Sequence, residues 1–578
     1  MLATGVLSLL LYTESMYFGS TKGVAVFECR PGVALNSTAL ISLLVYSGNV
    51  TIEGISIRSC FSYSPLISLI ASEGPALVRT VVMTNNTLQN SCKLGDRLSQ
   101  EANALVMISG EVHLWDFNFT GNTVNKLEQN ANSALCVVSP ILISFSGNCS
   151  IDHLLLDNNS LVTERSDLES NGILSLIRDQ DYDGVAEFHV IDSNISSNTL
   201  TASREAMGGA FAVNANMEDK VTFERIVVSD NTLRCQEGRG GAIAVSMASV
   251  QVLNCSFRNN SIVTSVDHSF SNNPKYALGG ALFLTDTLSA VVRGCNFTLN
   301  YLSLPSESAD EGSFLVGGAL GVLMCSNLEL IECNFTLNSI NASSDKMVGA
   351  IQAEGAALYM QFVDKANINH CRFANNTVTS SRKAFGGAAS ISGNFSRIQI
   401  ANTLFEYNEA VVVLNLTTRT SYAAAGALMS LSQSANPLFG PPLLIKNCSF
   451  NSNNVTFITS DHQTGNKTPA TLAGNALGGA LAVDLVSIEN TKFSSNAAKG
   501  LLGFGGAIHF FNPQPEPGTH IGPNVTFLSN EAHGIQMSGG GGLSFKVFAE
   551  ILMLHDLNAH FVFAEHPRSA ICYRYVAV

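Results

Sequence analysis

The stretch that decides the fold spans residues 279–300 and reads GGALFLTDTLSAVVRGCNFTLN. It begins with two glycines, an alanine and a large aliphatic residue, and it ends with a phenylalanine followed three positions later by an asparagine. The glycine signature begins again at Gly208, Gly240, Gly317, Gly386, Gly478 and Gly505, and the second signature recurs at Phe257 with Asn260, Phe335 with Asn338 and Phe373 with Asn376. A motif pair repeated at roughly 30–40 residues predicts a solenoid.

Large apolar residues occupy alternate positions in this stretch, Leu282 and Leu284 near its start and Cys295 and Phe297 near its end. A period of two indicates strands with one buried face. The connections leave no room for crossover helices, so such strands can stack in parallel only by coiling. We therefore expect an all-β chain that forms a right-handed parallel β-helix solenoid of the pectin-lyase-like type, with roughly 14 rungs.

The repeat pattern also predicts the domain organisation. We expect a divergent N-terminal cap or truncated start at residues 1–38, a β-helix repeat domain at 39–545, and a C-terminal cap or truncated end at 546–578. The stretch between an asparagine and the next glycine pair varies in length and is long at 263–278, 302–316 and 455–477. In solenoids such insertions fall on one face, which is often the binding face.

The repeated asparagine and glycines have physical roles. Asparagine tolerates the left-handed backbone of a sharp turn, so we expect that conformation at the asparagine itself. Stacked in successive rungs, its amides can bond one another along the axis. The paired glycines supply a tight bend and a close backbone approach.

Four cysteines stand two positions before the repeat phenylalanine in consecutive repeats, namely Cys255, Cys295, Cys333 and Cys371. Alternation directs them inward. In-register parallel neighbours point their Cβ atoms alongside one another, which favours buried free thiols acting as small hydrophobes, although the sequence leaves their redox state open. No zinc-type spacing links the other cysteines.

Composition narrows the class of protein. The chain of 578 residues is 46% hydrophobic, yet it contains no apolar run of the roughly 18 residues that a membrane helix needs. We therefore expect no transmembrane helix. The formal net charge of −14 argues against binding to nucleic acid or to an anionic membrane surface.

Asparagine glycosylation triplets indicate a secreted or surface protein. The candidates are Asn118, Asn254, Asn296, Asn334, Asn375, Asn447 and Asn524. The alternative is chance, because a repeat rich in Asn, Ser and Thr generates such triplets. Glycosylation requires a eukaryotic secretory route, so the localisation that we predict is extracellular or at the cell surface, and at the outer membrane if the source is bacterial.

One constellation could bind a metal ion. Asp179, Asp181 and Asp183 precede a glycine in the D-x-D-x-D-G pattern that opens a calcium loop, and Glu187 stands at the ninth position. Val190 occupies the twelfth position, where a bidentate glutamate belongs, and an acidic surface turn explains the same letters. Calcium is the single candidate cofactor.

Motifs of catalysis are absent from the sequence: there is no H-E-x-x-H, no G-x-S-x-G and no phosphate loop. The lone Trp115 stands in a predicted strand, where packing or edge cover is its simplest role.

The two signatures resemble the polymorphic outer-membrane protein repeats best known from chlamydiae, whose hallmarks are G-G-A-[ILV] and F-x-x-N. Residues 200–545 match well, and the first 200 residues match as a pattern only. The resemblance implies a parallel β-helix displayed outside the cell, in a family used for adhesion. The bacterial members end in a membrane barrel, whereas this chain ends Tyr575-Val576-Ala577-Val578, which suggests a eukaryotic relative or part of a longer surface protein.

We therefore predict a non-catalytic extracellular or cell-surface protein that recognises cell-surface glycans or proteins through its variable loops. One alternative is a carbohydrate-active enzyme, a polysaccharide lyase or hydrolase of pectate-lyase-like fold, which would need two carboxylates and an arginine stacked in adjacent rungs. The other is a passive structural segment of a larger, membrane-anchored surface protein.

Overall fold

The computed structural model describes residues 40–45, 49–63, 65–90, 104–126, 139–163, 170–179, 183–264, 275–304, 313–343, 351–414, 421–431, 442–459, 474–511, 519–539, 541 and 543–545. It also describes the short stretches 7–11, 16–19, 25–29, 34–35, 553–554 and 558–559. These residues form strands and no helix, and their strands pair in parallel, as the alternating pattern predicts.

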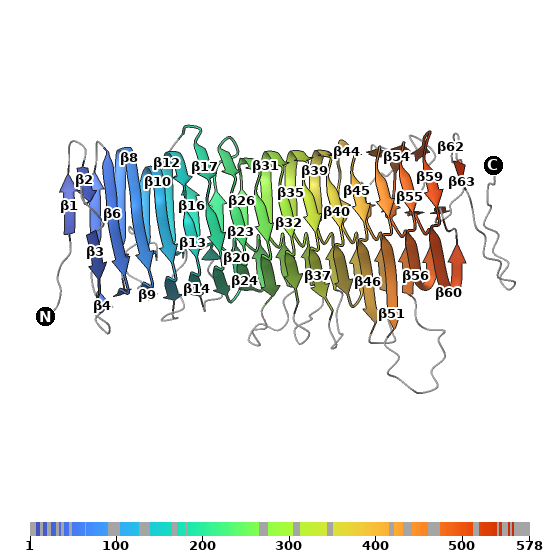
Figure 1. Ribbon diagram of the computed structural model, residues 1–578, viewed down its shortest axis with the longest axis horizontal. Coiled ribbons are helices and arrows are strands. Elements are labelled where there is room, and N and C mark those ends of the chain that lie inside the picture. The colour runs from blue at the N-terminus through green and yellow to red at the C-terminus, as the bar shows by residue number, and fades with distance from the viewer. Residues whose placement is uncertain are drawn as a thin grey trace, which may run out of the picture.

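Each strand pairs with the strand at the same place in the next copy of the motif. We call one such set of strands a repeat. In the quoted stretch, β31 (Leu282–Arg293) pairs with β35 (Leu320–Ile331), and β32 (Asn296–Thr298) pairs with β36 (Asn334–Thr336). These strands belong to a large sheet. A smaller sheet contains β33 (Tyr301–Ser303), which pairs with β37 (Ser339–Ala342). Figure 1 shows the strands standing side by side along the long axis.

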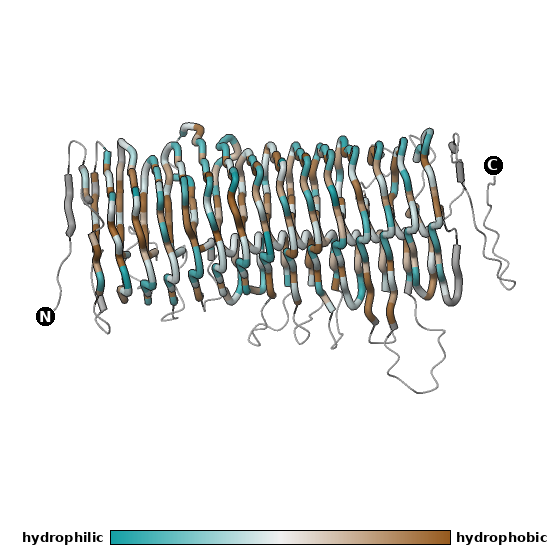
Figure 2. Tube along the Cα trace, viewed as in Figure 1, coloured by the Kyte–Doolittle hydropathy of each residue, from teal (hydrophilic) through white to brown (hydrophobic). Residues whose placement is uncertain are grey.

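A column of stacked phenylalanines runs through the core. Phe297 lies opposite Phe335 in the register, and their rings are parallel with centroids 4.7 Å apart. The same stacking continues from Phe257 to Phe527, with centroid distances up to 5.1 Å. Along the strands hydrophobic and hydrophilic residues alternate (Figure 2), which places one face of each strand in this core.

The repeat asparagines form a buried ladder of amides. The Asn338 side-chain oxygen accepts the backbone N–H and the side-chain amide of Asn300 at 3.0 and 3.1 Å. The Asn338 amide nitrogen donates to Asn376 Oδ1 and to the Phe297 carbonyl. The other members of this asparagine ladder are Asn86, Asn122, Asn159, Asn198, Asn231, Asn260, Asn408, Asn453, Asn496 and Asn530.

The left-handed backbone is not at the ladder asparagine, so that prediction is wrong. Leu299 and Leu337, which precede Asn300 and Asn338, have φ values of 59°. The residue before the asparagine adopts the left-handed conformation that makes the sharp turn. The asparagine itself does not adopt it, and its side-chain amide forms hydrogen bonds with the neighbouring repeats. The glycine prediction is confirmed at Gly280, where a Cβ atom would lie 2.0 Å from the Gly318 carbonyl oxygen.

The thiols of the cysteine column are free and buried, and they also form hydrogen bonds with the backbone. The Cys295 thiol donates to the Arg293 carbonyl, and its sulfur accepts the Cys255 backbone N–H at 3.4 Å. Ser193 and Thr403 hold the same position in other repeats and make the same two bonds through a hydroxyl. Leu154, Ile226 and Val525 hold this position in further repeats, so it takes either a small side chain that donates and accepts or a buried aliphatic one.

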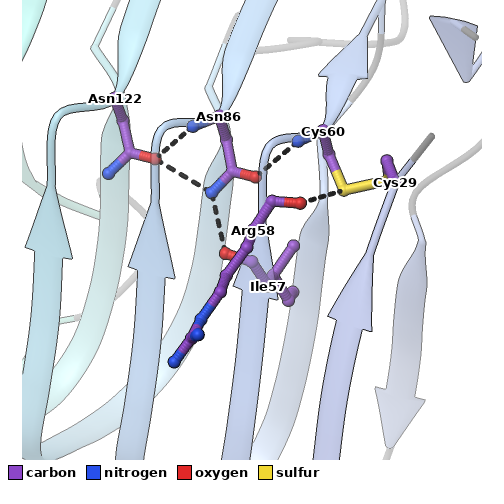
Figure 3. Close-up of a disulfide and its surroundings, with 6 residues drawn as sticks. All are labelled: Cys29, Ile57, Arg58, Cys60, Asn86 and Asn122. Carbon is purple, nitrogen blue, oxygen red and sulfur yellow. Dashed lines mark hydrogen bonds between the residues drawn. A yellow bond between two sulfur atoms is a disulfide. The ribbon is translucent and has the colours of Figure 1, made fainter. Parts of the chain in front are cut away.

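A disulfide links the first repeats, and the sequence pattern did not predict it. Cys60 holds the place of a ladder asparagine, since its backbone N–H donates to Asn86 Oδ1 at 3.0 Å (Figure 3). Its sulfur bonds to Cys29, which follows β3 (Ala25–Glu28). Glu28 lies opposite Arg58 in the register, so Cys29 is offset by one position from Cys60. That offset turns the two side chains toward each other, whereas cysteines in register point alongside.

Parallel pairing extends beyond residues 39–545 at both ends. Before this range, β1 (Leu7–Leu11) pairs with β5 (Ile41–Val45). After it, β63 (Asn558–Ala559) pairs with β59 (Thr526–Leu528).

Candidate functional site

A corner of the large sheet aligns three polar residues from consecutive repeats. His153 follows β12 (Ile141–Asp152), Asp192 follows β17 (Glu187–Ile191), and Arg225 follows β22 (Lys220–Glu224). All three have left-handed backbones, with φ values of 55°, 49° and 52°. Because these strands are in register, the three side chains stand in a row on the outer surface.

Trp115 lies beside this row. It belongs to β10 (Val106–Thr120), where it pairs with Asp152, and its indole stacks on the His153 imidazole with ring centroids 5.8 Å apart. The side chain is 48% exposed. The single tryptophan of the chain therefore packs on His153 and still presents about half of its surface to solvent.

Ion pairs connect the row. The Arg225 guanidinium donates to both oxygens of Asp192, at 2.7 and 2.9 Å, and it also contacts Glu224. The hydrogen bond from Arg225 lowers the pKa of Asp192, and the same bond raises the pKa of Arg225. His153 Nδ1 lies 2.8 Å from Asp152 Oδ1. We call Trp115, Asp152, His153, Asp192 and Arg225 the corner patch.

The corner patch contains potential metal ligands, but its contacts favour another use. One atom from each of Asp152, His153 and Asp192 lies within 4.8 Å of the others. However, both oxygens of Asp192 already accept hydrogen bonds from Arg225. A guanidinium at this place neutralises the carboxylate that a cation would need, so we assign no metal to the patch.

Those of the predicted calcium ligands that the structure describes contact different partners. Asp181 lies outside the described residues. The backbone N–H of Asp179 donates to the Phe145 carbonyl, and Asp183 begins the chain's next described stretch. Glu187 accepts a hydrogen bond from Lys220 at 2.8 Å, which lowers the pKa of Glu187.

A buried arginine side chain donates a hydrogen bond to the carbonyl at the end of this turn. The Arg178 guanidinium donates to the Gly184 carbonyl and lies near the carboxylate of Asp219, with 3.5 Å between Nε and Oδ2. Both side chains are buried. The described residues therefore present no assembled calcium-binding set, and calcium stays a prediction.

The glycosylation candidates fall on three kinds of position. Asn254, Asn447 and Asn524 are exposed residues with left-handed backbones, at the same corner as the patch but in later repeats. The other candidates are exposed at Asn296 in β32 and at Asn375 in a turn, and half-buried at Asn118 and Asn334. In the last two, the side-chain oxygen accepts a hydrogen bond from the threonine of its own triplet.

An open groove runs along the corner that carries Asn447 and Asn524. Its lining includes Asn402, Asn447, Asn490 and Asn524, one from each of four repeats. Neighbouring amides bond along it, from Asn447 to Asn402 and from Asn524 to Asn490. This part of the corner is rich in amides and is lined by one charged residue, Lys492, whereas the corner patch contains several.

The variable stretches predicted to bind lie partly outside the described residues, at 265–274, 305–312 and 460–473. The strands on either side of the first, β29 (Ser261–Thr264) and β30 (Tyr276–Leu278), belong to the small sheet.

A buried carboxylic acid lies outside the main core. Glu354 ends β38 (Gln352–Glu354), and its side chain accepts hydrogen bonds from Ser390 at 2.7 Å and from Gln352. Burial raises the pKa of Glu354. Burial, together with the charge of Glu354, also raises the pKa of Tyr359. The groups that donate to the Glu354 carboxyl are a serine hydroxyl and a side-chain amide, both of them neutral.

Comparison of the chain with protein-family models, with curated proteins and with solved structures finds no match. Among the described residues, no helix is long and apolar enough to cross a membrane. The function must therefore be inferred from the residues and geometry of this chain itself.

Proposed function

We propose that the chain is a right-handed parallel β-helix displayed outside the cell, where it recognises a surface partner without catalysis. The resemblance to polymorphic outer-membrane protein repeats supports this proposal, and so does the pairing of every repeat with the next, in which Phe297 lies opposite Phe335. A stack of this kind forms an elongated scaffold with a continuous outer surface.

The disulfide supports a location outside the cytosol. Disulfides persist in oxidising compartments and are rare in the cytosol. The Cys29–Cys60 bond lies at the start of the stack, while cysteines of the core such as Cys295 and Cys333 are buried and free. The exposed triplets at Asn254, Asn447 and Asn524 fit the same location, because glycans could be attached there without disturbing the core.

The corner patch is the observation that carries the recognition role. Tryptophan and arginine are enriched among the residues that dominate binding energy. Here Trp115 is half exposed, and His153 and the Asp192–Arg225 pair hold neighbouring polar groups in fixed positions. A surface that is ordered before binding loses less entropy when the partner binds.

A lyase-like enzyme is the second candidate, because Asp152, Asp192 and Arg225 stand in adjacent repeats. That is the arrangement that such an enzyme requires. The pKa shifts oppose it: Arg225 holds its proton more tightly than usual, and Asp192 loses its proton more readily. A catalytic acid or base needs a pKa near the working pH. We therefore prefer recognition to catalysis.

Adhesion of coated beads tests the recognition role. Beads carrying the purified chain should bind at least one cell type in a panel of animal, plant and microbial cells, and Trp115→Ala should reduce the binding at least tenfold. Tyr407→Ala is the matched control, since Tyr407 is an exposed aromatic residue in a distant repeat. Beads that bind no cell type, or that bind equally well with Trp115→Ala, would contradict the role.

A further inference from the structure

We propose that the corner patch binds a neutral saccharide, with one pyranose ring lying on the indole of Trp115. This inference rests on the recognition role proposed above and names the chemistry of its ligand. An aromatic ring surrounded by a few placed polar groups matches a sugar, whose ring C–H face is apolar and whose rim carries hydroxyls.

About half of the indole surface is exposed. Trp115 pairs with Asp152 on one side and with Arg79 on the other. His153 covers the side toward Asp152, where it stacks on the indole. On the other side, Arg79 and Thr80 are both exposed, and Trp115 itself is 48% exposed. The exposed part of the indole therefore has exposed neighbours at this end of β8 (Ile67–Thr84).

Donors and acceptors lie on both sides of the indole. Asp116, exposed and left-handed, follows Trp115 directly and offers carboxylate oxygens. Arg79 and Thr80 offer donors from the preceding repeat, and Arg225 and Asp192 complete the row beyond His153. Sugar hydroxyls donate and accept, so a mixed rim satisfies them better than a rim of one kind.

The charges around the patch select a neutral ligand. Asp116, Asp152, Asp192 and Glu224 outnumber the cations Arg79 and Arg225, and the whole chain carries a formal charge of −14. Arg225 is already paired with Asp192 and with Glu224. Sulfated, sialylated or uronate-rich glycans would meet repulsion at close range and from the field of the whole protein.

The single tryptophan makes the test direct, because fluorescence of the full chain reports on Trp115 alone. The purified chain is applied to an array of neutral and anionic glycans, and each array hit is then titrated in solution. We expect one or more neutral glycans to bind and to change the emission, and we expect sulfated and sialylated versions of the same glycans to bind at least tenfold more weakly.

Variants separate the patch from unspecific binding. Trp115→Ala should weaken array binding at least tenfold, and His153→Ala and Arg225→Ala should weaken it several-fold. Tyr407→Ala should leave it unchanged, since Tyr407 is exposed far from the patch. Thermal unfolding of each variant shows whether its fold is intact, and substitutions of these exposed residues should keep it so.

Three outcomes would overturn the inference: binding only to anionic glycans, binding that Trp115→Ala leaves unchanged, or no glycan binding by a preparation whose coated beads adhere to cells. In the last case, adhesion that is lost on protease treatment of the target cells and depends on Trp115 identifies a protein partner, and the recognition role survives without the saccharide. Failure of both the array and the beads would overturn both proposals.

Discussion

The side-chain oxygen of Asn86 accepts the backbone N–H of Cys60 at 3.0 Å, and the side-chain oxygen of Asn122 accepts that of Asn86 in the same way. Cys60 therefore stands where the asparagine ladder would continue, and it ends the ladder with a covalent bond to Cys29 (Figure 3). The disulfide therefore joins these two repeats at the place where the amide bonding stops.

Loss of the disulfide should loosen the first repeats and leave the later ones intact. The bond closes a sequence separation of 31 residues, for which the chain-entropy model gives between about 3 and 5 kcal/mol. With Cys29→Ser, we expect faster amide hydrogen exchange in β3 and in β6 (Val50–Arg58) and no change in β32. Added reductant should reproduce this result in the wild type and have no further effect on the variant. Unchanged exchange in β6 would contradict the stabilising role of the bond.

The asparagine ladder should be the most sensitive polar feature of the core. Asn338→Ala leaves the Asn300 backbone N–H, the Asn300 amide and the Phe297 carbonyl without their partner. Buried groups left unpaired cost about 1–3 kcal/mol each, so we expect a loss of at least about 3 kcal/mol in the free energy of unfolding, measured in urea.

Asn367→Ala is the matched control, since Asn367 is an exposed asparagine of β39 (Leu358–Asn369). Its effect should stay within about 0.5 kcal/mol. Equal losses for the two variants would show that asparagine at the ladder position has no special role.

The cysteine column should tolerate serine better than alanine. In Cys295→Ser a hydroxyl can still donate to the Arg293 carbonyl and accept the Cys255 N–H, as Ser193 and Thr403 do in their repeats. We expect Cys295→Ser to cost less than about 1 kcal/mol and Cys295→Ala to cost about 1–3 kcal/mol. If alanine is tolerated as well as serine, the thiol is only a filler of space.

Stability should fall with rising pH because of Glu354. In the unfolded chain, Glu354 releases its proton near the ordinary glutamate pKa of roughly 4.3. Burial raises the pKa of Glu354, so the folded chain keeps this proton up to a higher pH. The stability contributed by this group is fully present below the unfolded pKa and is lost as the pH rises through the folded pKa.

Glu354→Gln stays neutral at every pH and should remove this loss. Relative to the wild type, we expect the variant to gain stability between pH 4 and pH 8, as followed by urea unfolding at each pH. The exposed Glu332→Gln is the control and should show no such trend. A constant difference between Glu354→Gln and the wild type across this range would contradict the prediction.

The repeat itself could be predicted because it is local and recurrent. The strands, their parallel pairing and the stacked amides follow from alternation and from the Phe297–Asn300 signature. The position of the left-handed residue could not, because asparagine suits both the turn and the ladder, and only the structure shows that Leu299 makes the turn. The double hydrogen bonding of Cys295 was hidden for a similar reason, since a buried thiol also fits a purely apolar role.

The corner patch was missed because its members are far apart in the sequence and because the repeats of His153, Asp192 and Arg225 lack the repeat phenylalanine. A usable signal existed. His153, Asp192 and Arg225 each stand at the same distance before a ladder asparagine, namely Asn159, Asn198 and Asn231. Alignment of the repeats on the asparagine alone would have placed the three in one column. The disulfide was missed because Cys29 lies outside the recognisable repeats and is offset by one position from Cys60.

Antibody labelling of intact source cells is the most direct test of the central claim, that this chain is displayed outside the cell. The same cells are labelled after permeabilisation, and extracts are treated with an amidase that removes asparagine-linked glycans. We predict labelling of intact cells, with a mobility shift after the amidase if the route is eukaryotic. Labelling that appears only after permeabilisation, with no mobility shift, would contradict the claim.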